Sequence, residues 1–244
     1  MKRLARLLVF GALLALAVGG QLYLRSRQVA AAPAAAEGAL ALLGGLRSLA
    51  AEVVWFRADQ LQTQGRYVEL AQLATMLSHL EPHTPEVWSY AAWNLAYNVS
   101  VMMPTPEDRW RWVAAAIGLL RDDGLRLNPR SPELYRELAW LFELKLGIDI
   151  DSAAGVYRAK WRELVEDVAK RNAWAEIGMD SSLMPVLAES TGLRDYADPL
   201  FSAAYWASVG LQFASGHDQA VLVSIINQCG QIAQRRAAGA QAIR

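Results

Sequence analysis

Two stretches of the sequence decide the fold: LEPHTPEVW at residues 80–88 and LNPRSPELY at residues 127–135. They align at an offset of 47 (127 − 80 = 47), and the alignment continues without a gap to an Ala-Trp pair at 92–93 and at 139–140. Each copy has a leucine near the end of one helix, a proline that stops it, and a Thr-Pro or Ser-Pro pair that begins the next helix. The chain therefore contains an internal repeat built from pairs of helices.

Helix starts of this kind recur along the chain, because Thr84, Thr105, Ser131 and Asp198 each precede a proline. An oxygen at the N-cap accepts an otherwise unpaired backbone N–H, and proline loses nothing at the first helical position. No stretch alternates between apolar and polar residues for long enough to predict a sheet. We therefore predict an all-α protein whose consecutive helices form antiparallel hairpins. The predicted helices are 46–63, 66–80, 85–100, 106–122, 132–146, 153–172, 198–214 and 219–236, with a short or irregular segment at 176–192.

The repeated pattern also places a large aromatic side chain about one helical turn before a small alanine, so that two helices can approach closely. Its positions are Trp88, Ala91, Ala92 and Leu95 in one copy, Tyr135, Leu138, Ala139 and Phe142 in the next, and Gly65, Arg66, Tyr67, Leu70, Ala74, Leu77 and Pro82 in an earlier copy. This pattern resembles the tetratricopeptide repeat. The resemblance implies a short solenoid of stacked helical hairpins over 46–172, followed by a degraded further hairpin and a basic tail over 173–244. Arg57 and Ala58 depart from the family pattern, which leaves the number of repeats open.

In tetratricopeptide-like repeats the first helix of each pair lines a concave groove, and such proteins usually bind protein partners. The resemblance therefore implies a set of groove residues in this chain, which are Trp55, Asp59, Ser89, Trp93, Tyr97, Arg136, Trp140 and Glu143. Trp93 and Trp140 occupy equivalent places in the two copies and are expected to lie in register along one surface. The alternative is that both tryptophans are core residues between helices, since tryptophan in a helical repeat usually serves burial.

The first 25 residues have the composition of a membrane segment. Lys2, Arg3 and Arg6 precede an apolar run at 7–24, which is long enough to span a bilayer as a helix. A cleaved signal peptide is the alternative, but the apolar run extends beyond a typical signal sequence. We predict an uncleaved single-pass anchor at 1–25 and an Ala/Gly-rich tether at 26–45. The basic flank predicts a cytoplasmic N-terminus and an extracytoplasmic helical domain, periplasmic in a bacterium.

Charge and motifs weigh against several other classes of function. Lys and Arg total 24 and Asp and Glu total 24, so no net charge attracts nucleic acid. Cys229 is the single cysteine, which excludes an internal disulfide framework. His79 and His83 have the helical spacing of metal ligands, but Pro82 ends the helix between them, so we expect neither a metal nor a cofactor. Gly-x-Ser-x-Gly, a phosphate-binding glycine loop and His-Glu-x-x-His are also missing, and no small-molecule substrate is evident.

These observations predict a non-catalytic, membrane-anchored scaffold or assembly factor that binds protein partners of a membrane-bound or extracytoplasmic complex. Two alternatives stay open. One is a constitutive structural subunit of such a complex, which would remain stoichiometric through salt washing. The other is an enzyme with an unrecognised carboxylate or histidine site, which would place carboxylates of perturbed pKa together in a cleft.

Overall fold

The computed structural model describes residues 52–54 and 56–242, which all fall within the unit Arg47–Arg244. Helix is the only regular secondary structure in these residues, which confirms the all-α class. None of the described helices is both long and apolar enough to cross a bilayer. The predicted membrane segment at 1–25 and the tether at 26–45 lie outside the described residues.

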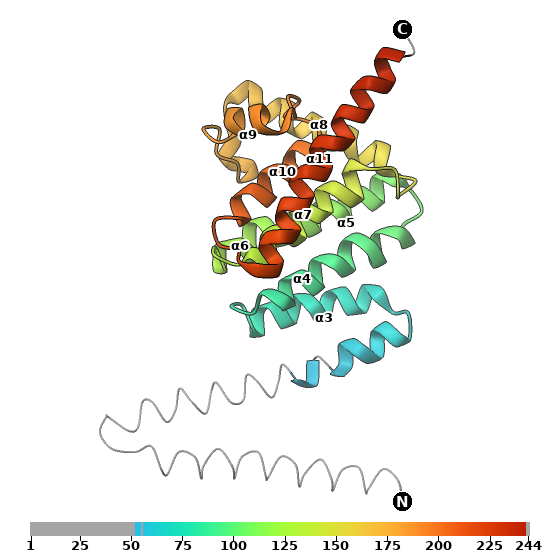
Figure 1. Ribbon diagram of the computed structural model, residues 1–244. Helices are drawn as coiled ribbons and strands as arrows, with labels where there is room; N and C mark the ends of the chain where they lie inside the picture. The colour runs from blue at the N-terminus through green and yellow to red at the C-terminus, as the bar shows by residue number, and fades with distance from the viewer. Residues whose placement is uncertain (1–51, 55, 243–244) are drawn as a thin grey trace, which may run out of the picture. The chain divides into compact units, whose positions relative to one another are not determined.

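Successive helices are joined by short loops, and most of them reverse the direction of the chain (Figure 1). The first described helical residues are 52–54 and 56–63. They are followed by α3 (Tyr67–Leu80), α4 (Pro85–Trp93) with the π-helical η1 (Asn94–Val99) and the 3₁₀ turn η2 (Ser100–Met102), α5 (Pro106–Gly118) with the π-helical η3 (Leu119–Gly124) and α6 (Leu125–Leu127), α7 (Pro132–Trp140) with the π-helical η4 (Leu141–Gly147), α8 (Ala154–Arg171), the 3₁₀ turn η5 (Trp174–Ile177), α9 (Met184–Thr191), α10 (Pro199–Gly210) and α11 (Gly216–Ala242). The segment at 176–192, predicted to be short or irregular, contains the end of η5 and the eight-residue helix α9.

The internal repeat extends to the backbone. α4 and α7 begin at prolines and end at tryptophans that are 47 residues apart (132 − 85 = 47 and 140 − 93 = 47). Each is continued by a π-helical segment, η1 after α4 and η4 after α7, so even this uncommon feature recurs at the same place. The repeated sequence therefore produces a repeated local structure.

Three of the four predicted N-caps make the expected hydrogen bond. Side-chain oxygens of Thr105, Ser131 and Asp198 accept backbone N–H groups near the starts of α5, α7 and α10. The prediction for Thr84 is wrong, since its side chain makes no capping hydrogen bond. The backbone carbonyl of Thr84 accepts the N–H of Val87 at 3.2 Å instead, so the first turn of α4 is closed by the main chain.

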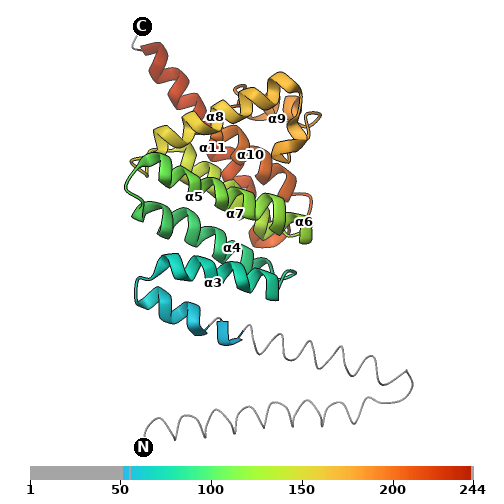
Figure 2. The ribbon, with the colours of Figure 1, turned by 180° about the vertical axis from the view of Figure 1, so that it is seen from behind.

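The helices form two rows, one seen in front in Figure 1 and the other in front in Figure 2. α4 packs against α7, and α7 packs against α10, which also packs against α11 (Figure 1). On the face seen in Figure 2, α5 packs against α8. Ala92 and Ala139, the small residues of the repeat, are 1% and 0% exposed in the main core cluster. Their burial confirms that α4 and α7 use these positions for packing.

Candidate functional site

α4 and α7 bring several of the implied groove residues to one pocket. Its cavity volume is about 380 Å³, and it lies between the two repeat-related helices and their π-helical continuations. The lining residues are Ser89, Ala92, Trp93 and Tyr97 from α4 and η1, Leu120 from η3, and Glu137, Trp140, Leu141 and Leu144 from α7 and η4. We call this the aromatic pocket. Four of the residues implied by the resemblance, Ser89, Trp93, Tyr97 and Trp140, therefore meet in one place.

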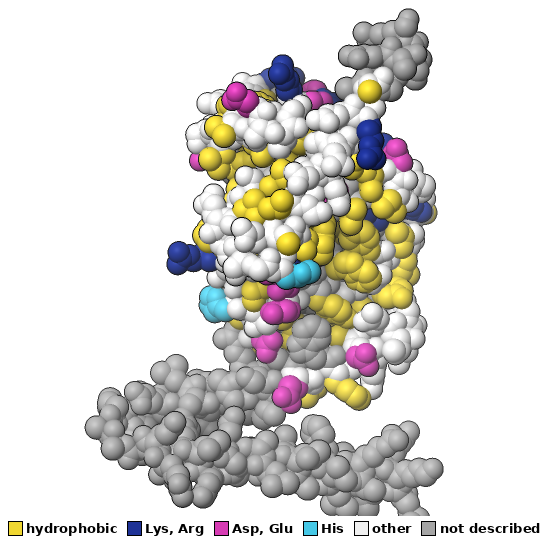
Figure 3. All heavy atoms as spheres, in the orientation of Figure 1, with side chains coloured by type: hydrophobic (Ala, Val, Ile, Leu, Met, Phe, Trp, Pro, Cys, Tyr) yellow, Lys and Arg dark blue, Asp and Glu magenta, His cyan; other side chains and the backbone are white. Residues whose placement is uncertain are grey.

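The three rings of the aromatic pocket are only partly covered by the protein. Trp93 is 46% exposed, and its ring stacks on that of Tyr97 with centroids 5.7 Å apart. Trp140 is half-buried and packs against the main core, and the guanidinium of Arg136 lies 5.2 Å from its ring centroid. Hydrophobic side chains gather on the face of the molecule that carries α4 and α7 (Figure 3). The pocket thus offers apolar aromatic surface to a ligand.

The remaining implied groove residues lie elsewhere. Arg136 does not line the pocket, because its side chain turns toward α11 and forms an ion pair with Asp218. Glu143 is 2% exposed and lies in the interior, where burial raises its pKa to about 7. Asp59 is exposed on the first described helix and lines none of the pockets described here, and Trp55 lies outside the described residues.

Glu137 and Leu144 are lining residues that the sequence analysis missed. The repeat offset could have found Leu144, because Tyr97 lines the pocket and lies 47 residues earlier (144 − 97 = 47). Glu137 had no comparable signal, since its equivalent at the same offset is Tyr90, which lines no part of this pocket. Glu137 lines the pocket because its side of α7 borders α4, and the packing of the helices decides which side that is.

A second pocket adjoins the aromatic pocket and shares Tyr97 and Leu144 with it. Its cavity volume is about 410 Å³, and its further lining residues are Val101, Arg109, Lys145, Ile150, Asp151 and Ser152. We call it the loop pocket, because much of it comes from the segments that follow η1 and η4. Because the two pockets share these lining residues, we call them together the groove.

The loop pocket is built around a buried ion pair. Lys145 is 3% exposed, and its Nζ lies 2.6 Å from a carboxylate oxygen of Asp151. Burial opposes ionisation of Asp151, but hydrogen bonds from Lys145 and from the Ala153 amide outweigh this and lower its pKa. Arg109 adds a second cation 3.7 Å from Asp151. The pocket therefore has two cations around one carboxylate, an excess of one positive charge (+2 − 1 = +1).

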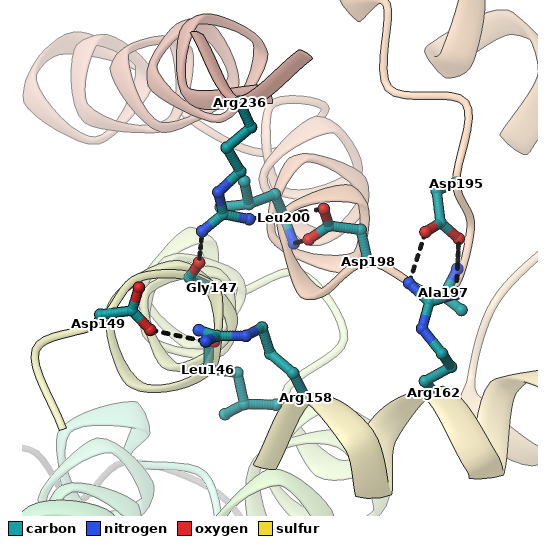
Figure 4. A network of polar contacts seen from close by, with 10 residues as sticks. All are labelled: Leu146, Gly147, Asp149, Arg158, Arg162, Asp195, Ala197, Asp198, Leu200 and Arg236. Carbon is teal, nitrogen blue, oxygen red and sulfur yellow. Dashed lines mark hydrogen bonds and ion pairs between the residues drawn. The ribbon is translucent and has the colours of Figure 1, made fainter. Parts of the chain in front are cut away.

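Two arginines hold the end of η4, and with it one side of the groove (Figure 4). Arg158 of α8 donates to the carbonyl of Leu146 at 3.1 Å, and Arg236 of α11 donates to the carbonyl of Gly147. Arg236 also lies 3.7 Å from the carboxylate of Asp198. Cationic donors suit the unpaired carbonyls at the C-terminal end of a helix. They hold the C-terminal end of η4 against α8 and α11.

The groove presents aromatic rings, aliphatic side chains and a few charged groups. The other titratable groups of note lie apart from it. Cys229 is fully buried, and burial raises its pKa, which disfavours the thiolate. Within the described part of the chain, no three His, Cys, Asp or Glu side chains come together in a way that could hold a metal ion.

Comparison with known proteins identifies no relative: no family model, no curated protein and no solved structure matches this chain. A role for the chain must therefore be inferred from the groove and its repeat-related helices. The geometry of the groove, its exposed aromatic rings and its charges are the features that bear on this role.

Proposed function

We propose that this chain is a non-catalytic, tetratricopeptide-like scaffold that binds a segment of a partner protein in the groove formed by the aromatic and loop pockets. One observation carries the proposal. Two repeat-related helices place Trp93, Tyr97 and Trp140 around a single pocket, and Trp93 remains 46% exposed there. Tryptophan and tyrosine are enriched among the residues that dominate protein–protein binding energy, since they bury much apolar area.

The shape of the groove supports a chain segment as its occupant. The two pockets share Tyr97 and Leu144 as lining residues, so a segment bound in one lies next to the other. Exposed apolar side chains continue along it, with Val101 at 48% and Ile150 at 72% exposure. A peptide segment can place successive side chains in adjoining pockets, as helical repeats with extended concave surfaces allow.

The proposal includes a location for this scaffold. The apolar run at 7–24 follows Lys2, Arg3 and Arg6, and it would anchor the chain in a membrane with a cytoplasmic N-terminus. The helical domain would then lie on the extracytoplasmic side, tethered through residues 26–45. A scaffold in this position would hold or assemble protein components of a membrane-bound or extracytoplasmic complex.

The test is partner capture by the full-length protein in mild detergent, compared between the wild type and Trp93→Ala. Trp93 is half exposed, so we expect the melting temperature to change little. Capture should fall about thirtyfold or more, equivalent to about 2 kcal/mol or more for a residue that dominates binding. A photo-crosslinking residue at position 101, where the exposed Val101 lines the loop pocket, should also form adducts with the captured partner.

Val186 on α9 provides the control, because it is 67% exposed and lies outside both pockets. Val186→Ala should leave capture and melting unchanged, and a crosslinker at position 186 should form no adduct. Equal capture by Trp93→Ala and the wild type would exclude the groove as the binding surface.

A further inference from the structure

The acidic side of the aromatic pocket is incompletely neutralised. Glu137 lines the pocket with 20% of its side chain exposed, and its ion pair is with Arg136 at 3.4 Å. The same guanidinium also pairs with Asp218. Within the described residues, Glu137 and Asp218 make their ion pairs with this one guanidinium, so Glu137 has no cation of its own.

A second carboxylate lies next to the pocket, and pKa shifts show how weakly the acidic groups there are compensated. Glu133 accepts a hydrogen bond from the hydroxyl of the lining residue Ser89 at 2.9 Å. Burial raises the pKa of Tyr97, and the nearby carboxylates of Glu137 and Glu143 raise it further. Burial also raises the pKa of Glu137, because Arg136 offsets only part of the cost of removing the carboxylate from water. A cation entering this pocket would therefore meet an under-compensated carboxylate.

The aromatic rings favour the same ligand. The faces of tryptophan and tyrosine attract cations, and the effect is strongest where water is partly excluded. The protein already places cations over two of the rings, with Arg136 5.2 Å from Trp140 and Lys145 5.0 Å from Tyr97. Trp93 is the most exposed ring of the three, and its pocket is open to an incoming side chain.

We propose that the aromatic pocket receives a lysine or arginine side chain of the partner segment, whose charged end meets Glu137 and whose stem lies against Trp93. An acidic side chain is disfavoured here by the same carboxylates, and it suits the loop pocket, where Arg109 and Lys145 outnumber Asp151. This inference rests on the proposed function, since it specifies which chemistry the groove selects.

The experiment selects peptides from a display library of random short sequences on the full-length protein in detergent. We expect the enriched peptides to contain lysine or arginine and to lose binding to Trp93→Ala. For one such peptide, Glu137→Gln should weaken binding about tenfold or more, because a hydrogen bond to a charged group is replaced by a neutral one. Replacing the basic residue of the peptide by norleucine should weaken binding to the wild type but not to Glu137→Gln.

Glu189→Gln is the matched control, because Glu189 is exposed on α9 and lies outside the pockets. It should leave peptide binding unchanged, and circular dichroism should show that both glutamine variants are folded. The inference would be overturned if the peptides that depend on Trp93 carried no basic residue. It would also be overturned if they bound Glu137→Gln as tightly as the wild type. In either case the groove would remain a binding site. Failure to enrich any peptide that depends on Trp93 would overturn both the inference and the proposed function.

Discussion

At the scale of single residues, Glu143 is a carboxylate that folding removes from water without supplying a partner. It is 2% exposed on η4, and no hydrogen bond or ion pair joins its side chain to another described residue. Burial disfavours its charged form and raises its pKa from 4.5 to about 7. Near neutral pH the protein therefore holds this side chain partly protonated.

This burial predicts a pH-dependent cost at one position. Below pH 4.5 Glu143 is protonated in both the folded and unfolded chains, so it costs nothing. As the pH rises from 4.5 to about 7, the unfolded chain ionises first and the folded state loses stability relative to it, and above about 7 the cost stays constant. Glu143→Gln should therefore raise the free energy of unfolding at pH 8 by about 3 kcal/mol, since the folded-state pKa is about 2.5 higher and each pKa unit corresponds to about 1.4 kcal/mol.

Urea unfolding of the wild type and of Glu143→Gln at several pH values measures this difference. The two curves should converge toward pH 4.5 and separate as the pH rises. The comparison between the two proteins cancels the opposite contribution of Asp151 and Asp195, whose lowered pKa values favour folding at higher pH. A difference that is constant with pH would show that Glu143 ionises normally in the folded protein.

At the scale of helices, the contact between α7 and α10 requires a residue without a side chain. A Cβ atom added to Gly210 would lie 2.6 Å from the Cβ of Tyr135 and 3.2 Å from a methyl carbon of Leu222. The repeat aromatic of α7 therefore packs directly against the backbone of α10. Tyr135 is further held by its hydroxyl, which donates to the carbonyl of Pro129 at 3.1 Å, as Trp88 donates to Pro82 in the preceding repeat.

Gly210→Ala should destabilise the protein by about 1–3 kcal/mol, because the added methyl group overpacks this contact. Gly155 in α8 is the matched control, since a Cβ there meets nothing within 4 Å. Gly155→Ala should stabilise the protein by about 0.4–1 kcal/mol, because alanine restricts the unfolded chain and fits the helix. Chemical denaturation of both variants measures the contrast, and equal effects of the two substitutions would contradict the close contact.

At the scale of the whole described domain, Arg236 joins parts of the chain that are far apart in sequence. It reaches from α11 to the carbonyl of Gly147, 89 residues earlier, and to the carboxylate of Asp198 beside α10 (Figure 4). The last helix is thereby connected to the end of η4, which borders the groove. Stability of the C-terminal helix and of the groove should consequently be linked.

Arg236→Ala should lower the free energy of unfolding by about 1 kcal/mol, a modest loss because the side chain is 40% exposed and its ion pair is screened by water. Arg235→Ala is the control, because Arg235 is exposed and has no ion pair or hydrogen bond with another described residue. Hydrogen exchange should show faster opening of η4 in Arg236→Ala alone. Unchanged exchange in η4 would mean that α11 and η4 open independently.

The groove residues on α4 and η1 could be predicted from the sequence, but several of those on α7 and η4 could not. The resemblance to the tetratricopeptide repeat implied Ser89, Trp93 and Tyr97 as groove residues on α4 and η1, and all three line the aromatic pocket. On α7 and η4 the resemblance implied Arg136, Trp140 and Glu143, of which only Trp140 lines the pocket. Glu137 and Leu144 line it in place of the other two. α7 packs against α4 and also against α10 and α11. Which of its side chains faces α4 is therefore set by the packing of all these helices.

The sequence by itself determined the helical class, the helix starts at the cap-proline pairs and the 47-residue repeat that relates α4 to α7. These are local properties, since capping, proline geometry and helical periodicity act over a few residues. Only the tertiary structure decided that Arg136 faces α11 while Glu137 faces the groove, that Glu143 is buried, and that Arg236 reaches η4. Those outcomes depend on contacts between residues many tens of positions apart, such as Arg136 with Asp218, and no local pattern specifies them.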